Sequence, residues 1–217
     1  MKNIILLAVQ GAGKGTVSES LEEKYNYVHI STGDLLRERR KKDDEIGRII
    51  AETQDKGSLT PQKIVFKVLE ERLSEKDVEN GYILDGFPRT LDQALEYDKL
   101  LNKIGKEAGI VINLTVPDDI LIDRITSRRT CNKCGKIYNV NFASMKPKIE
   151  GKCDDCDGEL FIRSDDANED AIRTRINIYH ENVGGLISFY KDKGILFDID
   201  STETKKAIVE VEKLIED

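Results

Sequence analysis

Five short apolar runs are spaced along the chain, with polar or helical patterns between them. Their near-continuous hydrophobicity is typical of strands that are buried on both faces, as in a parallel sheet. The runs are residues 3–9, 27–30, 82–85, 110–116 and 195–199. We therefore predict a five-stranded parallel sheet.

Helical periodicity fills the intervals between these runs. Apolar residues three or four positions apart form one face of a helix. One such stripe comprises Ile64, Val65, Val68, Leu69 and Leu73, and another comprises Ile172, Ile176, Tyr179, Val183 and Leu186. Alternating strands and helices predict right-handed crossovers and an α/β fold, which binds ligands at the carboxyl ends of its strands.

Two intervals break this alternation. Residues 31–60 are polar and helical, and Ser31 or Thr32 is placed to cap the first helix. Residues 127–164 contain all the cysteines and are expected to form a small β unit. Because both intervals lie between core elements, we interpret them as insertions into a core of residues 1–30, 61–126 and 165–217.

The first apolar run leads into a glycine-rich turn, in the stretch LLAVQGAGKGTVSESL at residues 6–21. Gly11, Gly13 and Gly15 allow successive backbone N–H groups to turn toward an anion. The helix that starts near Lys14 points its positive end at the same place, and Lys14 adds a mobile charge. A strand, a loop and a helix in this order predict a P-loop that binds nucleotide phosphates, rather than a glycine-rich connection that binds nothing.

A second group of polar residues follows the third apolar run, in YILDGFPRT. Asp85 ends a buried strand, where an isolated carboxylate is unfavourable unless it meets a cation or hydrogen-bond donors. Beside a P-loop we expect that partner to be Mg²⁺, held through water. Arg89 stands where a phosphate would lie at the edge of the sheet.

Arginines gather around the second insertion, at Arg124, Arg128, Arg163 and Arg175. An arginine binds phosphate oxygens in a bidentate fashion and stays charged when water is excluded. Arg124 and Arg128 are four residues apart and so share one helix face. We interpret the four as clamps for a transferred phosphoryl group, and Arg39, Arg40 and Arg129 as solvated.

The four cysteines form two Cys-x-x-Cys pairs, Cys131/Cys134 and Cys153/Cys156. In a reducing compartment this spacing predicts a tetrahedral four-thiolate zinc site. The alternatives are two local disulfides or free thiols.

Length and charge narrow the class of protein. The 217 residues suffice for one sizeable core with small insertions, and the net charge of −7 provides no basic surface for general nucleic-acid binding. No apolar run is long enough to cross a membrane, and the first run has no signal-peptide cleavage site after it. We expect a cytoplasmic protein.

At these intervals the motifs GAGKGT, STGDLLR, LDGFPRT, DRITSRR and RSDD…RTRINIYH resemble those of the adenylate kinases, and the paired cysteines resemble the zinc-bearing lid of the long bacterial form. The resemblance runs from the first strand to the last helix. It implies reversible transfer of a phosphoryl group from ATP to AMP by a monomer that uses Mg²⁺, with both insertions closing over the nucleotides.

The resemblance also implies roles for particular residues. The ATP site would comprise Gly11, Ala12, Gly13, Lys14, Gly15, Thr16, Arg124, Arg128 and Tyr138. The AMP site would comprise Thr32, Arg37, Gly86, Arg89, Gln93, Arg163 and Arg175. The catalytic residues would be Lys14, Asp85, Arg89, Arg124, Arg163 and Arg175, with Asp34 assisting Asp85 around Mg²⁺. Zinc at Cys131, Cys134, Cys153 and Cys156 would be structural, because four thiolates leave no open position.

The chain departs from the family pattern at several positions. Ala8 replaces a loop glycine and is expected to have β-region geometry, which a positive φ would refute, and Gln10 replaces a proline. We expect the Gln10 amide to find a new partner, and a proline restored there to stabilise the protein slightly. Arg173 competes with Arg175 for the clamp role because the segment before them is one residue longer. Ser201 stands where the family often has glycine near the adenine.

Two other functions remain open from the sequence. One is a sibling nucleoside monophosphate kinase that acts on UMP or CMP, although Gln93 and Thr32 favour AMP. The other is a zinc-ribbon binding module gated by ATP, which the acidic charge and the DGFPRT cluster disfavour because a switch needs no second phosphate pocket.

Overall fold

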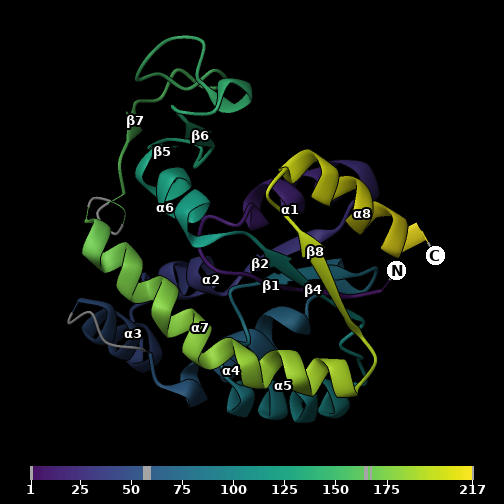
Figure 1. The fold of residues 1–217 in the computed structure, drawn as a ribbon. Helices are drawn as coiled ribbons and strands as arrows, with labels where there is room; N and C mark the ends of the chain where they lie inside the picture. Colours follow the sequence, from purple (N-terminus) through teal and green to yellow (C-terminus); the bar gives the residue numbers. More distant parts are fainter. Residues whose placement is uncertain (1, 56–59, 164–165, 167, 217) are drawn as a thin grey trace. The chain divides into compact units, whose positions relative to one another are not determined.

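The computed structural model describes residues 2–55, 60–163, 166 and 168–216. Its strands are β1 (Ile4–Leu7), β2 (Val28–Ser31), β3 (Tyr82–Asp85), β4 (Ile110–Thr115), β5 (Arg128–Cys131), β6 (Ile137–Asn139), β7 (Leu160–Phe161) and β8 (Leu196–Asp200). Its helices are α1 (Lys14–Tyr25), α2 (Thr32–Arg39), α3 (Glu45–Asp55), α4 (Gln62–Leu73), α5 (Leu91–Lys103), α6 (Asp118–Thr126), α7 (Glu169–Asp192) and α8 (Thr204–Glu216), with 3-10 turns η1 (Lys76–Val78) and η2 (Ala143–Met145) (Figure 1).

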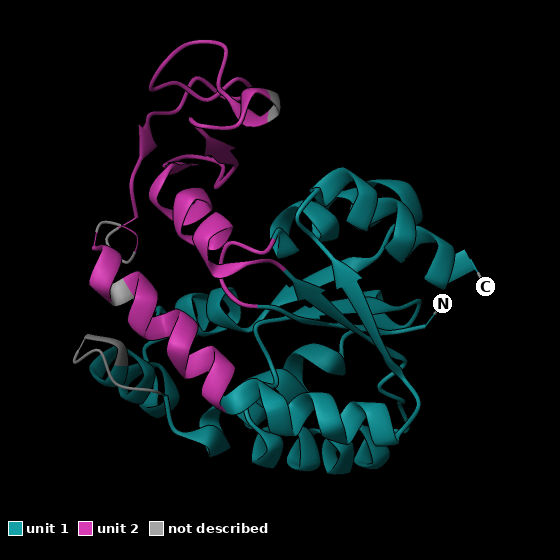
Figure 2. Ribbon diagram, in the orientation of Figure 1, with its two compact units in different colours: residues 1–8, 13–115, 182–217 teal, residues 9–12, 116–181 magenta. Residues whose placement is uncertain are grey.

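The chain divides into two compact units (Figure 2). The first unit comprises residues 1–8, 13–115 and 182–217, and the second comprises residues 9–12 and 116–181. The division into a core and two insertions that the sequence suggests has different bounds and stays a prediction.

The main sheet lies in the first unit and has five parallel strands in the order β2-β3-β1-β4-β8. This confirms the predicted α/β fold with a five-stranded parallel sheet. The chain runs from β1 outward to β2, and from β3 across to β4 on the other side. The topological switch therefore lies between β1 and β3, and ligands are expected beyond the carboxyl ends of these strands.

Both faces of this sheet are buried, as its continuous apolar strands predict. Strand residues such as Ile5 and Leu84 share one core cluster with α4, α5 and the carboxyl-terminal part of α7. The alternating residues Ile4, Leu6 and Ile83 are also buried, and α1 and α8 pack together over that face (Figure 1).

The second unit has a sheet of its own. Strands β6-β5-β7 form a three-stranded antiparallel sheet in the interval that carries the cysteines, so the predicted small β unit is present. Cys131, Tyr138 and Cys153 are buried together as its core. Helix α6 and residues 169–181 of α7 complete this unit.

The polar interval after β2 is helical, as predicted, and forms α2 and α3. The Ser31 hydroxyl caps α2 by accepting a hydrogen bond from the backbone N–H of Asp34 at 3.4 Å. The end of this interval, residues 56–59, lies outside the described residues. Of the helices described, none is long and apolar enough to cross a membrane.

Candidate active site and metal centre

The glycine-rich loop follows β1 and turns into α1 at Lys14. Gly11 has φ +89° and Gly13 has φ +94°, values that an L side chain rarely adopts. A Cβ on Gly11 would lie 2.9 Å from Ile125 Cγ1 in the second unit. Gly15 is already part of α1, so of the three loop glycines only the first two need left-handed backbone. Among the described non-glycine residues, positive φ occurs at Asn26 and Asp157 alone, so Ala8 does not have the positive φ that would refute its expected β-region geometry.

Asp85 ends β3 in the first unit, near Lys14 at the start of α1. Lys14 Nζ donates to the backbone oxygen of Ala8 at 2.9 Å and lies 3.9 Å from Asp85 Oδ1. His29 Nε2 lies 3.5 Å from Asp85 Oδ2. Burial acts to raise the pKa of Asp85, but neighbouring His29 and the charge of Lys14 outweigh it and keep that pKa below its ordinary value. A carboxylate that stays ionised at the end of a strand suits a hydrated Mg²⁺ ion.

Several residues expected to bind AMP lie around the same strand end. The Thr32 hydroxyl donates to the backbone oxygen of Asp85 at 3.0 Å. Arg89 Nε donates to the backbone oxygen of Gly86 at 2.8 Å, and Gln93 Oε1 accepts from the backbone N–H of Arg89 at 2.7 Å.

Arg37 and Asp34 lie in α2 and form an exposed ion pair with each other. Asp34 was expected to assist Asp85 around Mg²⁺, and its carboxylate is instead engaged by an arginine of its own helix. That assisting role stays a prediction.

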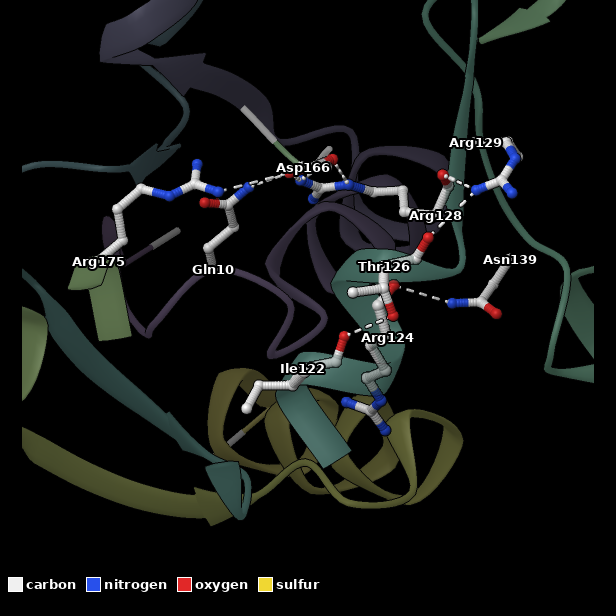
Figure 3. Close-up of polar contacts among 9 residues, drawn as sticks. All are labelled: Gln10, Ile122, Arg124, Thr126, Arg128, Arg129, Asn139, Asp166 and Arg175. Carbon is white, nitrogen blue, oxygen red and sulfur yellow. Dashed lines mark hydrogen bonds and ion pairs between the residues drawn. The ribbon is translucent and has the colours of Figure 1, made fainter. Parts of the chain in front are cut away.

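A buried carboxylate organises the arginines of the second unit (Figure 3). The side chain of Asp166 has no exposed surface. Arg128 binds it in a bidentate fashion, with Nε at 2.8 Å from Oδ2 and Nη2 at 2.7 Å from Oδ1. Arg175 Nη2 lies 3.7 Å from Oδ1, and Gln10 Nε2 donates to the same oxygen at 2.9 Å. The predicted new partner of the Gln10 amide is therefore Asp166.

The other arginines of this unit differ in their surroundings. Arg124 Nη1 donates to the backbone oxygen of Gly11 at 3.4 Å. Arg163 is half-buried, and residues 164–165 after it lie outside the described residues. Arg173 pairs with Glu169 on the exposed face of α7 at 2.7 Å. Of the two competing arginines, Arg175 is the one that joins Asp166.

The four cysteines come together at one point, with all four sulfur atoms within 4.8 Å of one another. The sulfur atoms of Cys131 and Cys156 are 3.4 Å apart, and those of Cys134 and Cys153 are 3.6 Å apart. Four thiolates at about 2.3 Å from zinc would stand about 3.8 Å from each other. The thiols are free, and their spacing fits a tetrahedral metal rather than disulfides.

Tyr138 belongs to this cysteine cluster. It is 3% exposed, its hydroxyl lies 3.3 Å from Cys153 Sγ, and the same oxygen accepts from the backbone N–H of Asp154 at 2.7 Å. The hydroxyl hydrogen bond lowers the pKa of the Cys153 thiol, which favours the thiolate that binds metal. Contact between Tyr138 and ATP stays a prediction, and we do not include it in the site proposed below.

Two charged residues of these clusters, His29 and Asp166, could not be recognised from a local sequence pattern. His29 is an isolated histidine in a short strand, and its partner Asp85 comes from another strand. Asp166 lies in the quoted RSDD motif, but its pairing with Arg128 spans 38 residues and needs the fold.

A glycine-rich loop between a parallel strand and a helix, with Lys14 paired to a strand-end aspartate, defines a nucleotide-phosphate-binding protein of the P-loop class. The family model for adenylate kinase matches residues 6–195. The chain belongs to the adenylate kinase family, whose members are phosphotransferases of the nucleoside monophosphate kinase type.

Relatives of similar length support this membership. The chain is 45% identical to an adenylate kinase of Archaeoglobus fulgidus over 99% of this chain and 98% of that protein. It is 43% identical to an adenylate kinase of Fervidobacterium nodosum over 98% and 95% of the two chains, and 44% identical to that of Caldicellulosiruptor bescii over 89% and 88%.

Proposed function

We propose that this enzyme catalyses the reversible, Mg²⁺-dependent transfer of the terminal phosphoryl group from ATP to AMP, which yields two ADP and maintains the adenine nucleotide balance. The position of Asp85 is the main support for this proposal. Its carboxylate lies 3.9 Å from Lys14 of the phosphate loop, and its backbone oxygen accepts from Thr32 of the expected AMP site. The end of β3 thus contacts both a residue expected to bind the ATP phosphates and a residue of the expected AMP site.

The proposed reaction is a direct transfer. An oxygen of the AMP phosphate attacks the γ-phosphorus of ATP in line with the bond to the β–γ bridging oxygen, and that bond breaks to release ADP. Lys14 and the loop N–H groups bind the ATP phosphates, and Arg89 holds the phosphate of AMP. The guanidinium groups of the second unit neutralise the charge on the moving group. Their full set is Arg124, Arg128, Arg163 and Arg175.

Two metals have separate parts in this proposal. Magnesium, when bound with ATP, supplies charge neutralisation at the phosphates, and Asp85 would hold its water ligands. Zinc would be held by the four cysteines and would stabilise the small β unit, with no part in the transfer. Residues 31–60 would form the AMP-binding insertion and residues 127–164 the lid. We also propose a monomer that works in the cytoplasm, where thiols stay reduced.

A bisubstrate analogue, two adenosines joined by five phosphates, tests the proposal. It should inhibit competitively against ATP and also against AMP, because it would occupy both sites. Inhibition against ATP alone would argue for a protein with a single nucleotide site, such as the ATP-gated binding module.

A matched pair of arginine variants tests the assignment of the clamp. Arg175→Ala should lower kcat by roughly 10²-fold or more, since it removes charge stabilisation from the transition state. Arg173→Ala, two residues away and paired with exposed Glu169, should change kcat less than about twofold. The reverse ranking would assign the clamp to Arg173.

A further inference from the structure

Gln10 lies in the phosphate loop, four residues before Lys14, but its side chain contacts the arginine cluster of the second unit. Its amide nitrogen donates to Asp166 Oδ1 at 2.9 Å, across 156 residues of sequence (Figure 3). We propose that Gln10 is a positioning residue for ATP, which holds Asp166 and thereby sets the orientation of Arg128 and Arg175. The proposal builds on the proposed function, because it assigns these arginines to nucleotide phosphates.

The hydrogen bonds around Asp166 explain how Gln10 can affect the orientation of Arg128 and Arg175. The Asp166 side chain is fully buried, so its carboxylate depends on hydrogen-bond donors inside the fold. Arg128 provides two and Gln10 provides one, while Arg175 contributes a longer ion pair at 3.7 Å. Among these partners Gln10 is the uncharged one.

This difference in charge matters when phosphates bind. A phosphate group attracts guanidinium groups and competes with Asp166 for Arg128 and Arg175. A buried carboxylate that loses its donors is strongly destabilised. Gln10 keeps one hydrogen bond on Asp166 through that exchange, so the arginines can turn to the nucleotide at a smaller penalty.

Gly11, the next residue of the loop, also contacts an arginine of the second unit. The backbone oxygen of Gly11 accepts from Arg124 Nη1 at 3.4 Å, so two consecutive loop residues contact the arginine system of this unit. A side chain at position 10 without a donor would leave the Gly11 contact but remove the one to Asp166. The effect of Gln10 is therefore separable from the backbone of the loop.

Three variants of the full-length, zinc-loaded protein separate positioning from simple packing. Gln10→Met keeps the length of the side chain and removes the donor. Gln10→Glu keeps the shape and places a carboxylate against Asp166. Gln62→Met applies the same change to an exposed glutamine at the start of α4 and serves as the matched control.

The readout is the equilibrium Kd for ATP and, separately, for AMP, by calorimetry without the second substrate. We expect Gln10→Met to weaken ATP binding by roughly three- to tenfold, the loss equivalent to one hydrogen bond, and Gln10→Glu to weaken it further. AMP binding should weaken less than ATP binding, because Arg128 of the expected ATP site binds Asp166 through two hydrogen bonds, whereas Arg175 of the expected AMP site has only the longer ion pair. The Gln62→Met control should change either Kd less than about twofold. Equal ATP affinity of Gln10→Met and wild type, or equal losses for ATP and AMP, would overturn the proposal.

A double-mutant comparison tests whether Gln10 acts through Asp166. In a folded Asp166→Ala background, Gln10→Met should have little further effect on the Kd for ATP, and an undiminished effect would contradict the mechanism. If Asp166→Ala does not fold, the ranking of glutamine, methionine and glutamate at position 10 decides the question. Because these are binding measurements, a failure of ATP-to-AMP transfer in the wild type would reject the proposed function and leave this ranking interpretable.

Discussion

Gly13→Ala is a sharp test of how the phosphate loop is built. Gly13 has φ +94°, and a Cβ there would stand 3.2 Å from Ser201 Oγ and 3.2 Å from Thr204 Cγ2. The left-handed backbone costs an alanine about 1–2 kcal/mol, and the crowding adds roughly another 1–2 kcal/mol. We expect the free energy of unfolding to fall by about 2–4 kcal/mol.

Gly105→Ala is the matched control for this prediction. Gly105 also has positive φ, +67°, but a Cβ there would meet nothing within 4 Å. This variant should lose only the backbone contribution of about 1–2 kcal/mol and should bind ATP like the wild type.

Urea unfolding and the Kd for ATP decide between these expectations. Because a Cβ at position 13 forces the loop to shift, Gly13→Ala should also weaken ATP binding by about tenfold or more, which Gly105→Ala should not. Equal stability losses in the two variants, with ATP binding unchanged in both, would refute the claim that the close approach at Gly13 shapes the phosphate site.

Three further predictions concern the charged and metal-binding groups. Asp85→Asn should reduce kcat/KM about 10- to 100-fold and raise the Mg²⁺ concentration needed for half-maximal rate, and an unchanged Mg²⁺ requirement would argue against its metal role. Burial acts to lower the pKa of His29, but the Asp85 carboxylate raises it above 6.5 overall. The pairing of protonated His29 with Asp85 therefore stabilises the fold fully below pH 6.5, and this stabilisation is lost as the pH rises through the higher pKa that His29 has in the folded protein. The free energy of unfolding should fall above pH 6.5, and His29→Gln should flatten this change. Tyr138→Phe removes the hydroxyl beside Cys153 and should release zinc to a chromogenic chelator about tenfold faster, whereas a wild-type release rate would show that the hydroxyl does not stabilise the metal site.

The fold was accessible from the sequence because its signals are local. All five strands of the main sheet were located to within two residues at each end, since each is a separate apolar run. The first run was extended too far, to residue 9, because Val9 is apolar, whereas β1 ends at Leu7. At Ala8 the chain already turns into the loop, and its carbonyl accepts from Lys14.

The candidate site was less accessible because its contacts join distant segments. The cysteine cluster was predicted from spacing alone, since two Cys-x-x-Cys pairs have few other uses. The role of Asp166 depends on residues 10, 128 and 175 meeting in space, which no local pattern encodes. The same contact reverses one expectation: a proline at position 10 would remove a hydrogen bond to a buried carboxylate, so we no longer expect it to stabilise the protein.

The resemblance placed Tyr138 at the ATP site, and that placement stays a prediction. The structure buries Tyr138 and puts its hydroxyl 3.3 Å from Cys153 Sγ, a contact that the motif match did not indicate. This contact depends on the packing of the small sheet, which no local pattern encodes.

Product analysis with the purified protein tests whether a phosphoryl group passes from ATP to AMP. The purified protein is given ATP and Mg²⁺ with AMP, CMP or UMP in turn, and the nucleoside diphosphates formed are quantified. We expect the highest kcat/KM with AMP and two ADP formed for each ATP consumed. Faster turnover with CMP or UMP, or ATP hydrolysis without transfer, would contradict it.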